Sequence, residues 1–137
     1  MVETANTPAS QGAIDAIVRM ARTLPGVNPQ RVGLFGHSRG SAAALVYGAQ
    51  SGGVTGVIAA AGYPPLSPGI IHSRPPLLIL QGTADDEVGP ARQFESGVRA
   101  GGWTVDSHYY LGGDHYLFYN EPTHADVVSR ITAFFKR

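Results

Sequence analysis

The chain has 137 residues, of which 43% are hydrophobic and 15% are charged, and its formal net charge is zero. This balance gives no indication of binding to nucleic acid or to an anionic membrane surface, and the absence of cysteine excludes disulfides and thiolate metal sites. No apolar run approaches the roughly 20 residues of a membrane span, and the polar N-terminus does not resemble a secretory signal. We therefore expect a cytoplasmic protein that forms one domain over residues 1–137.

The first half of the chain alternates helical and extended patterns. An amphipathic helix is expected first, because apolar residues follow the spacing of one helix face: Ile14, Ile17, Val18, Ala21 and Leu24. A short buried strand at residues 31–35 then leads into an alanine-rich helix over residues 39–50. Residues 54–61 are apolar at nearly every position, which is typical of a strand covered on both faces.

The second half continues the alternation. A proline-rich loop at residues 62–76 precedes a third strand at residues 77–81, and Pro90 opens the next helix. Residues 103–111 alternate more in polarity, which favours an outer strand. A final helix carries apolar residues on one side: Val127, Val128, Ile131, Phe134 and Phe135. This order predicts an α/β fold, a three-layer sandwich with a short, mainly parallel sheet of about four strands.

The pattern Gly-His-Ser-Arg-Gly at residues 36–40 lies directly between the first strand and the alanine-rich helix. A serine in such a turn adopts a strained backbone conformation, and small flanking residues let the strand and the helix approach each other. The N-terminus of the helix offers N–H groups to a developing oxyanion, with the Arg39 N–H as one donor. The context predicts a catalytic nucleophile at Ser38. A phosphate-binding P-loop is excluded because no Gly-Lys-Ser/Thr follows.

A nucleophilic serine needs a base and an acid that orients the base. In parallel sheets these groups lie in loops beyond the carboxyl ends of strands. Asp85 follows the third strand and is our candidate for the acid, with its neighbour Asp86 as the alternative; the same acidic loop could instead cap the next helix. His115 follows the outer strand in a glycine-bearing loop and is our candidate for the base.

The other histidines are less favourably placed to act as the base. His37 lies inside the serine turn, and the rest lie in the proline-rich loop, the outer strand and the last helix (His72, His108 and His124). A metal site formed by Asp86, Asp114 and His115 has no recognised ligand spacing, so we expect no metal. A metal-dependent hydrolase is kept as a third possibility.

Together these features resemble the α/β-hydrolase superfamily, and within it the dienelactone hydrolase-like serine esterases. Residues 24–45 look like the family's approach helix, strand and nucleophile turn, residues 77–88 like its acid loop, and residues 112–118 like its histidine loop. The resemblance runs from about residue 11 to the C-terminus. It implies that Ser38, Asp85 and His115 form a catalytic triad and that no cofactor is needed.

The sequence departs from the family because several strands that usually precede the approach helix have no counterpart. The loop that normally supplies one oxyanion donor follows one of these strands and also has no counterpart. The strand at residues 31–35 would also become an exposed apolar edge, which is a liability for a folded protein. We therefore expect a shortened, minimal domain and a homo-oligomer that covers this edge.

The leading interpretation is a carboxylesterase that cleaves small or short-chain acyl esters through an acyl-enzyme. We expect His37, Arg39 and Tyr63 to contact the substrate, with apolar residues of the proline-rich loop as a further wall (Leu66, Ile70 and Ile71). The alternative is a non-catalytic fragment or interaction module that keeps the fold but lacks a complete oxyanion hole.

Overall fold

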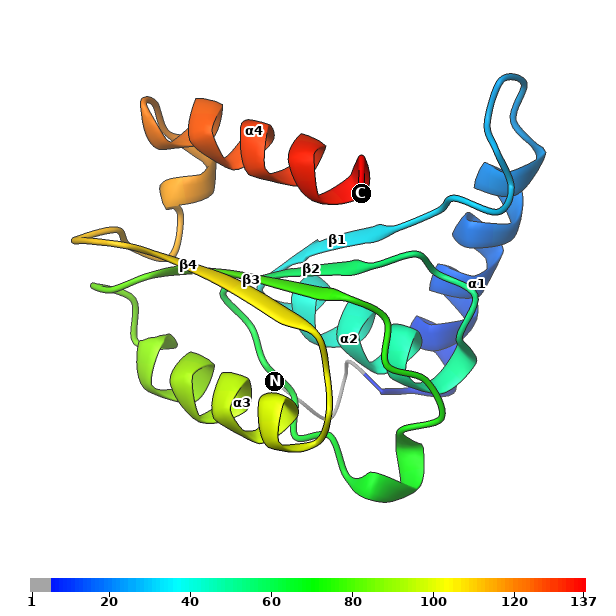
Figure 1. Ribbon diagram of the computed structural model, residues 1–137, viewed down its shortest axis with the longest axis horizontal. Helices are drawn as coiled ribbons and strands as arrows, with labels where there is room; N and C mark the ends of the chain where they lie inside the picture. The colour runs from blue at the N-terminus through cyan, green and yellow to red at the C-terminus, as the bar shows by residue number, and fades with distance from the viewer. Residues whose placement is uncertain (1–5) are drawn as a thin grey trace.

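The computed structural model describes residues 6–137 and contains a four-stranded parallel sheet in the order β1-β2-β3-β4 (Figure 1). The strands are β1 (Leu34–His37), β2 (Val57–Ala60), β3 (Leu77–Gly82) and β4 (Val105–Tyr110). The helices are α1 (Pro8–Thr23), α2 (Arg39–Ser51), α3 (Val88–Ala100) and α4 (Thr123–Phe135), with short 3-10 helices η1 (Pro68–Ile70) and η2 (Leu117–Tyr119). The predicted α/β fold with a short parallel sheet is confirmed.

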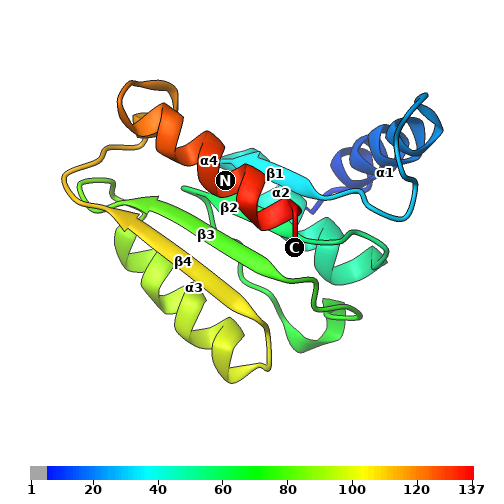
Figure 2. The ribbon, with the colours of Figure 1, turned by 45° about the horizontal axis from the view of Figure 1, so that its top comes forward.

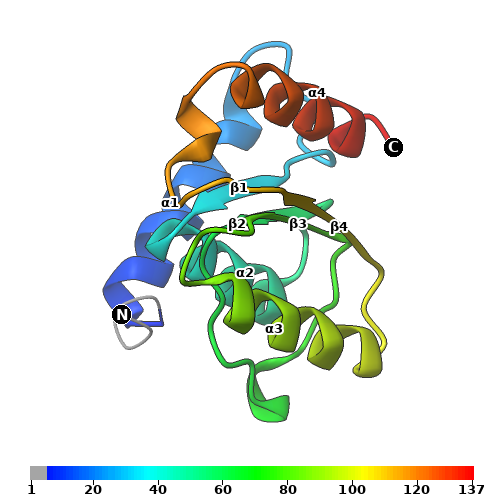
Figure 3. The ribbon, with the colours of Figure 1, turned by 90° about the vertical axis from the view of Figure 1, so that its left-hand side faces the viewer.

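The helices cover both faces of the sheet. Figure 3 shows α4 on one face and α2 with α3 on the other. Each strand lies beside the preceding one and runs parallel to it, so successive right-handed crossovers put α2 and α3 on the same face. Helix α1 packs against α2, beyond the β1 side of the sheet (Figure 2). In the described part of the chain, no helix is long and apolar enough to cross a membrane.

The two central strands form the core. Their side chains alternate between the faces, and four of them pack in the cluster that includes α2 and α3: Val57, Ala59, Leu77 and Ile79. The intervening four pack with α4 and η2: Ile58, Ala60, Leu78 and Leu80. Both strands are buried along their whole length, as the continuous apolar runs predicted.

The strand at residues 31–35 differs from its prediction in two respects. It begins at Leu34 and extends to His37, because its length is set by pairing with Val57–Ala60 of β2. It is also only partly buried: among residues 6–137, β1 pairs with β2 alone, and Phe35 is 43% exposed. An exposed apolar edge, as expected from the sequence, is therefore present at β1.

Smaller differences concern the helices. Helix α3 begins at Val88, before the predicted start at Pro90, and the proline-rich loop contains the single turn η1. The apolar face of α1 buries Val18 but leaves Ile17 exposed, because α1 packs against α2 and not over the sheet. Leu24, which was predicted on the same face, follows the end of α1 and is exposed.

Candidate active site

Ser38 connects β1 to α2 in a strained conformation. Its φ of 56° and ψ of −120° lie in a region that residues with a side chain rarely adopt. The Ser38 N–H donates to the Ala60 carbonyl at 2.8 Å, and the Ser38 carbonyl accepts from the Ala42 N–H at 3.2 Å. Hydrogen bonds on both sides thus hold the serine at the carboxyl end of β1 and the N-terminus of α2.

Two glycines make this turn possible. A Cβ atom at Gly36 would lie 2.2 Å from the Gly40 carbonyl oxygen, and one at Gly62 would lie 2.1 Å from the Ser38 carbonyl oxygen. A Cβ atom at Gly40 would meet nothing within 4 Å. The prediction that small residues on both sides of the serine permit the close approach is therefore right for Gly36 and wrong for Gly40. Gly62, which follows Ala61 with its φ of 54°, has the role that we assigned to Gly40.

The structure brings Ser38, Asp85 and His115 into one hydrogen-bonded series. The Ser38 Oγ lies 3.0 Å from the His115 Nε2, and the His115 Nδ1 lies 2.9 Å from the Asp85 Oδ2. An ionised carboxylate only accepts hydrogen bonds, so Nδ1 carries the ring proton and Nε2 presents a lone pair to the serine hydroxyl. The three side chains follow β1, β3 and β4, at the edge of the sheet where the sequence predicted them.

Asp85 is held by three donors. Its Oδ1 accepts from the Glu87 N–H at 3.0 Å, and its Oδ2 accepts from the Gln81 Nε2 at 3.0 Å as well as from His115. Burial raises the pKa of Asp85, but these hydrogen bonds outweigh it and hold the pKa below its ordinary value of 3.8. The group is therefore a carboxylate at neutral pH. The alternative residue, Asp86, is exposed.

His37 lies under the histidine loop. Its Nε2 donates to the His115 carbonyl at 2.8 Å, and its Nδ1 accepts from the Tyr119 hydroxyl at 3.1 Å. The carbonyl can only accept, which assigns the ring proton to Nε2. Both ring nitrogens of His37 thus hold the loop that carries His115. Sequence reasoning missed this contact and that of Tyr119, because the partners are remote along the chain.

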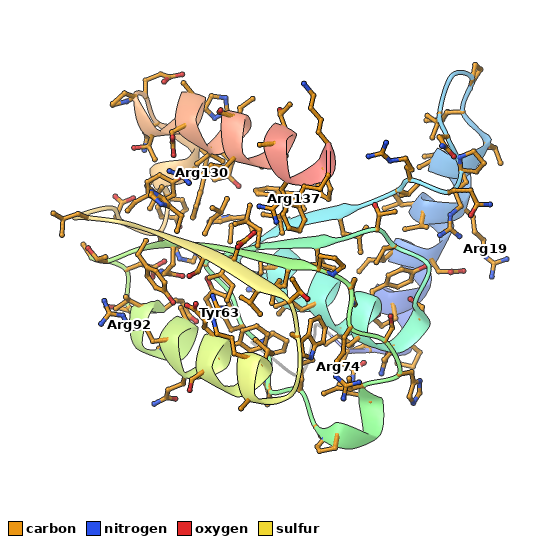
Figure 4. The ribbon with its side chains drawn as sticks, in the orientation of Figure 1. Arg19, Tyr63, Arg74, Arg92, Arg130 and Arg137 are labelled. Carbon is orange, nitrogen blue, oxygen red and sulfur yellow. The ribbon has the colours of Figure 1, made fainter. Side chains whose placement is uncertain are left out.

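Tyr63 points toward the acid from the proline-rich loop. Its hydroxyl donates to the Gln81 Oε1 at 2.9 Å, and its ring lies 5.4 Å from that of Phe94, between the sheet and α3 (Figure 4). A cavity of about 370 Å³ beside it includes Leu66 and Ile71 in its lining, but not Ile70. None of Ser38, Asp85 and His115 lines this cavity. The apolar wall expected from the loop therefore faces α3.

Arg39 is exposed and is the first residue of α2. The N–H groups in the first turn of a helix have no carbonyl partner within that helix, so the Arg39 N–H is open to a ligand beside Ser38. Of the remaining histidines, His72 is exposed, His108 lies within β4, and the His124 Nδ1 donates to the Phe118 carbonyl at 2.9 Å. Among residues 6–137, no group of three or more histidine and acidic side chains is arranged to hold a metal ion.

Comparison with known proteins gives one family and several solved structures of similar fold. The family model that matches is that of the dienelactone hydrolase family, over residues 1–137. No curated protein matches the chain. A solved structure of a dienelactone hydrolase-like promiscuous phosphotriesterase from metagenomic libraries is 18% identical, with a TM-score of 0.76 over 93% of this chain and 60% of that one.

Two esterases are also similar in fold. Esterase PE8 is 22% identical, with a TM-score of 0.75 over 91% of this chain and 60% of that one. A thermophilic esterase from Thermogutta terrifontis is 18% identical, with a TM-score of 0.66 over 92% of this chain and 63% of that one. The chain thus spans about 60% of the length of these proteins.

Proposed function

The chain belongs to the dienelactone hydrolase family, and from this premise we propose that it is a serine hydrolase that cleaves carboxylic esters through an acyl-enzyme. The observation that carries the proposal is the hydrogen-bonded series from Ser38 through His115 to Asp85, with contacts of 3.0 and 2.9 Å. Contacts of this length are those expected between a nucleophile, its base and an orienting acid.

In the proposed mechanism, the His115 Nε2 accepts the proton of the Ser38 hydroxyl as the serine oxygen attacks the ester carbonyl. The Asp85 carboxylate stabilises the imidazolium that forms. His115 then gives the proton to the leaving alcohol, and the acyl group remains on Ser38. In the second half of the reaction, His115 activates a water molecule that releases the acid.

The Arg39 N–H is the donor that we propose for the oxyanion of the tetrahedral intermediate. It lies in the first turn of α2, where the helix N-terminus favours negative charge. The residues described here suggest no second donor. Loss of one of two such donors costs about 10²–10³ in kcat, so we propose that the chain alone turns over slowly.

Small or short-chain acyl esters are the proposed substrates. The His115 side chain is 29% exposed, and the neighbouring Tyr116 and Tyr119 are each 62% exposed, so the approach to Ser38 is open. An open approach offers little apolar surface to a long acyl chain.

A second copy of the chain is the partner that we propose for β1. The free side of β1 adjoins an apolar groove whose lining includes Ile14, Ile17, Leu34 and Phe35. Two copies related by a twofold axis could pair their β1 strands and cover both grooves. The zero net charge of the chain means that two copies do not repel each other strongly.

The proposed function is tested by hydrolysis of a short-chain chromogenic ester. Ser38→Ala and His115→Ala are expected to remove activity above the background, and a chelator is expected to have no effect. Hydrolysis that survives Ser38→Ala but is lost with the chelator would contradict the proposal and favour a metal-dependent hydrolase. Absence of hydrolysis in the wild type would favour the non-catalytic module, for which the exposed β1 edge is the supporting observation.

The choice of acid is tested by a matched pair of variants. Asp85→Asn is expected to lower kcat by about 10⁴, because the amide would turn the imidazole to the wrong tautomer. Asp86→Asn, one residue along and exposed, is the control and is expected to leave kcat unchanged. The reverse result would assign the acid to Asp86.

A further inference from the structure

We propose that Gln81 is a positioning residue for the acid of the triad, and that Tyr63 fixes Gln81 in turn. A buried series of hydrogen bonds would then connect the proline-rich loop to the contact between Asp85 and His115. The inference deepens the proposed hydrolase function and rests on it. It names two residues that act through Asp85.

Gln81 is an unexpected residue for its position. Every residue of β3 is buried, and Gln81 is 0% exposed near the carboxyl end of this central strand. A buried amide is unfavourable unless its donors and acceptor all find partners, and an aliphatic residue would pack there without that demand. Packing alone therefore does not account for a glutamine here.

The side-chain amide of Gln81 is fully hydrogen-bonded. Its Nε2 donates to the Asp85 Oδ2 at 3.0 Å and to the Gly82 carbonyl at 3.1 Å, while its Oε1 accepts from the Tyr63 hydroxyl at 2.9 Å. A carboxylate and a carbonyl only accept, so the amide nitrogen must face Asp85 and Gly82. The orientation of the amide is thus determined by its partners.

Gln81 contacts the same carboxylate oxygen of Asp85 as His115 does. Gln81 and His115 both donate to the Asp85 Oδ2, whereas the Glu87 N–H donates to Oδ1. The terminal torsion of an aspartate is broad, so the carboxylate plane is set by its donors. Removal of Gln81 leaves Oδ2 with His115 alone and allows the plane to rotate.

Tyr63 is the outer residue of the series. Burial raises the pKa of the Tyr63 hydroxyl, so it stays protonated and donates to Gln81 at neutral pH. Its ring packs near Phe94 of α3, which fixes the direction of the hydroxyl. Figure 4 shows Tyr63 between the sheet and α3.

Two readouts separate a positioning role from a merely structural one. The first is the proton NMR resonance of the His115 Nδ1–H, which reports its hydrogen bond to Asp85. The second is the rate at which a fluorophosphonate probe reacts with Ser38. Gln81→Leu is expected to move the resonance upfield or broaden it and to slow the reaction about 10–100-fold, the range found when a partner behind a functional side chain is removed.

Tyr63→Phe is the second variant, and it keeps the ring while removing the donor to Gln81. We expect a smaller change in the His115 resonance and a reaction with the probe that is slowed by less than about tenfold. Tyr47→Phe is the matched control, because the Tyr47 hydroxyl donates to the Asp15 Oδ1 at 3.0 Å in a contact remote from the site. It is expected to leave both readouts unchanged.

Each outcome decides the proposal. A wild type that reacts with the probe, together with a Gln81→Leu variant of equal rate and unchanged resonance, would overturn the positioning role and leave the hydrolase function intact. A wild type that does not react would contradict the hydrolase function, and the resonance would still support or overturn the role of Gln81. If Gln81→Leu does not fold, Tyr63→Phe decides by the same two readouts.

Discussion

The two edges of the sheet are built differently. At the β4 edge, polar side chains find polar partners in the same chain: Asp106 pairs with Arg137, and the hydroxyls of Ser107 and Tyr109 donate to Glu95 of α3. At the β1 edge, Phe35 is 43% exposed beside an apolar groove. The β4 edge suits contact with water, whereas β1 has the composition of a strand from the middle of a sheet.

The candidate site has residues near both edges. The acid and the base follow β3 and β4, toward the edge with polar partners. The nucleophile follows β1, on the side that is open. We infer that this chain holds all the residues that activate Ser38. Full stabilisation of the oxyanion depends instead on what covers β1.

The largest expected effect concerns the serine turn on the β1 side. Gly36→Ala places a Cβ atom 2.2 Å from the Gly40 carbonyl oxygen, so we expect a loss of at least about 1–3 kcal/mol in the free energy of unfolding. Gly40→Ala is the control within the same motif. A Cβ atom there meets nothing within 4 Å, and alanine favours the helix by about 0.5–1 kcal/mol. Urea unfolding measures both, and equal effects would contradict the proposed packing.

A second effect concerns the association of two copies through β1. Phe35→Lys places a charge on the free edge of the strand, so we expect the particle mass in light scattering to fall from that of a dimer to that of a monomer. Val128→Lys is the control, because Val128 is 46% exposed on α4 and lies outside the groove. It is expected to remain dimeric. A wild type that is monomeric at micromolar concentration would disprove the proposed partner.

The smallest effect concerns Glu95 at the β4 edge. Burial raises the pKa of Glu95, but hydrogen bonds from Ser107, Arg99 and Tyr109 outweigh it and hold the pKa below its ordinary value of 4.5. A lowered pKa stabilises the fold above the ordinary value, and this contribution is lost as the pH falls through the pKa of the folded state. Glu95→Gln should therefore reduce the free energy of unfolding by about 1 kcal/mol at pH 7.

The same difference between wild type and Glu95→Gln should shrink toward zero as the pH falls below about 4. Urea unfolding at several pH values checks this. Glu121→Gln, at an exposed glutamate, serves as the control for the loss of one negative charge. A difference that stays constant down to pH 3 would show that the ionised form of Glu95 is not the stabilising one.

Much of the fold follows from patterns that are local in the sequence. The apolar runs at residues 54–61 and 77–81 predicted central strands, and both β2 and β3 are buried throughout. The start of β1 could not be predicted in this way. The short apolar run at residues 31–35 suggests a strand, but pairing with β2 begins only at Leu34.

The positions of the candidate site residues could be predicted from the sequence where the topology of the sheet alone determines them. Loops that follow parallel strands converge at one edge, and this placed Ser38, Asp85 and His115 in the same region. Sequence favoured Asp85 as the acid but kept Asp86 as the alternative, because neighbours in a loop differ mainly in where their side chains point. Gly62 lies against Ser38, and Gln81 accepts a hydrogen bond from Tyr63. Both partners are remote along the chain, and no periodicity records such contacts.

Reaction of the wild-type protein with a fluorophosphonate probe tests the central claim most directly, because it measures activation of the serine apart from substrate choice and turnover. The account predicts one adduct per chain, found on Ser38 by mass spectrometry of peptides and strongly slowed in His115→Ala. A wild type that forms no adduct, or a His115→Ala variant that reacts at the wild-type rate, would contradict it.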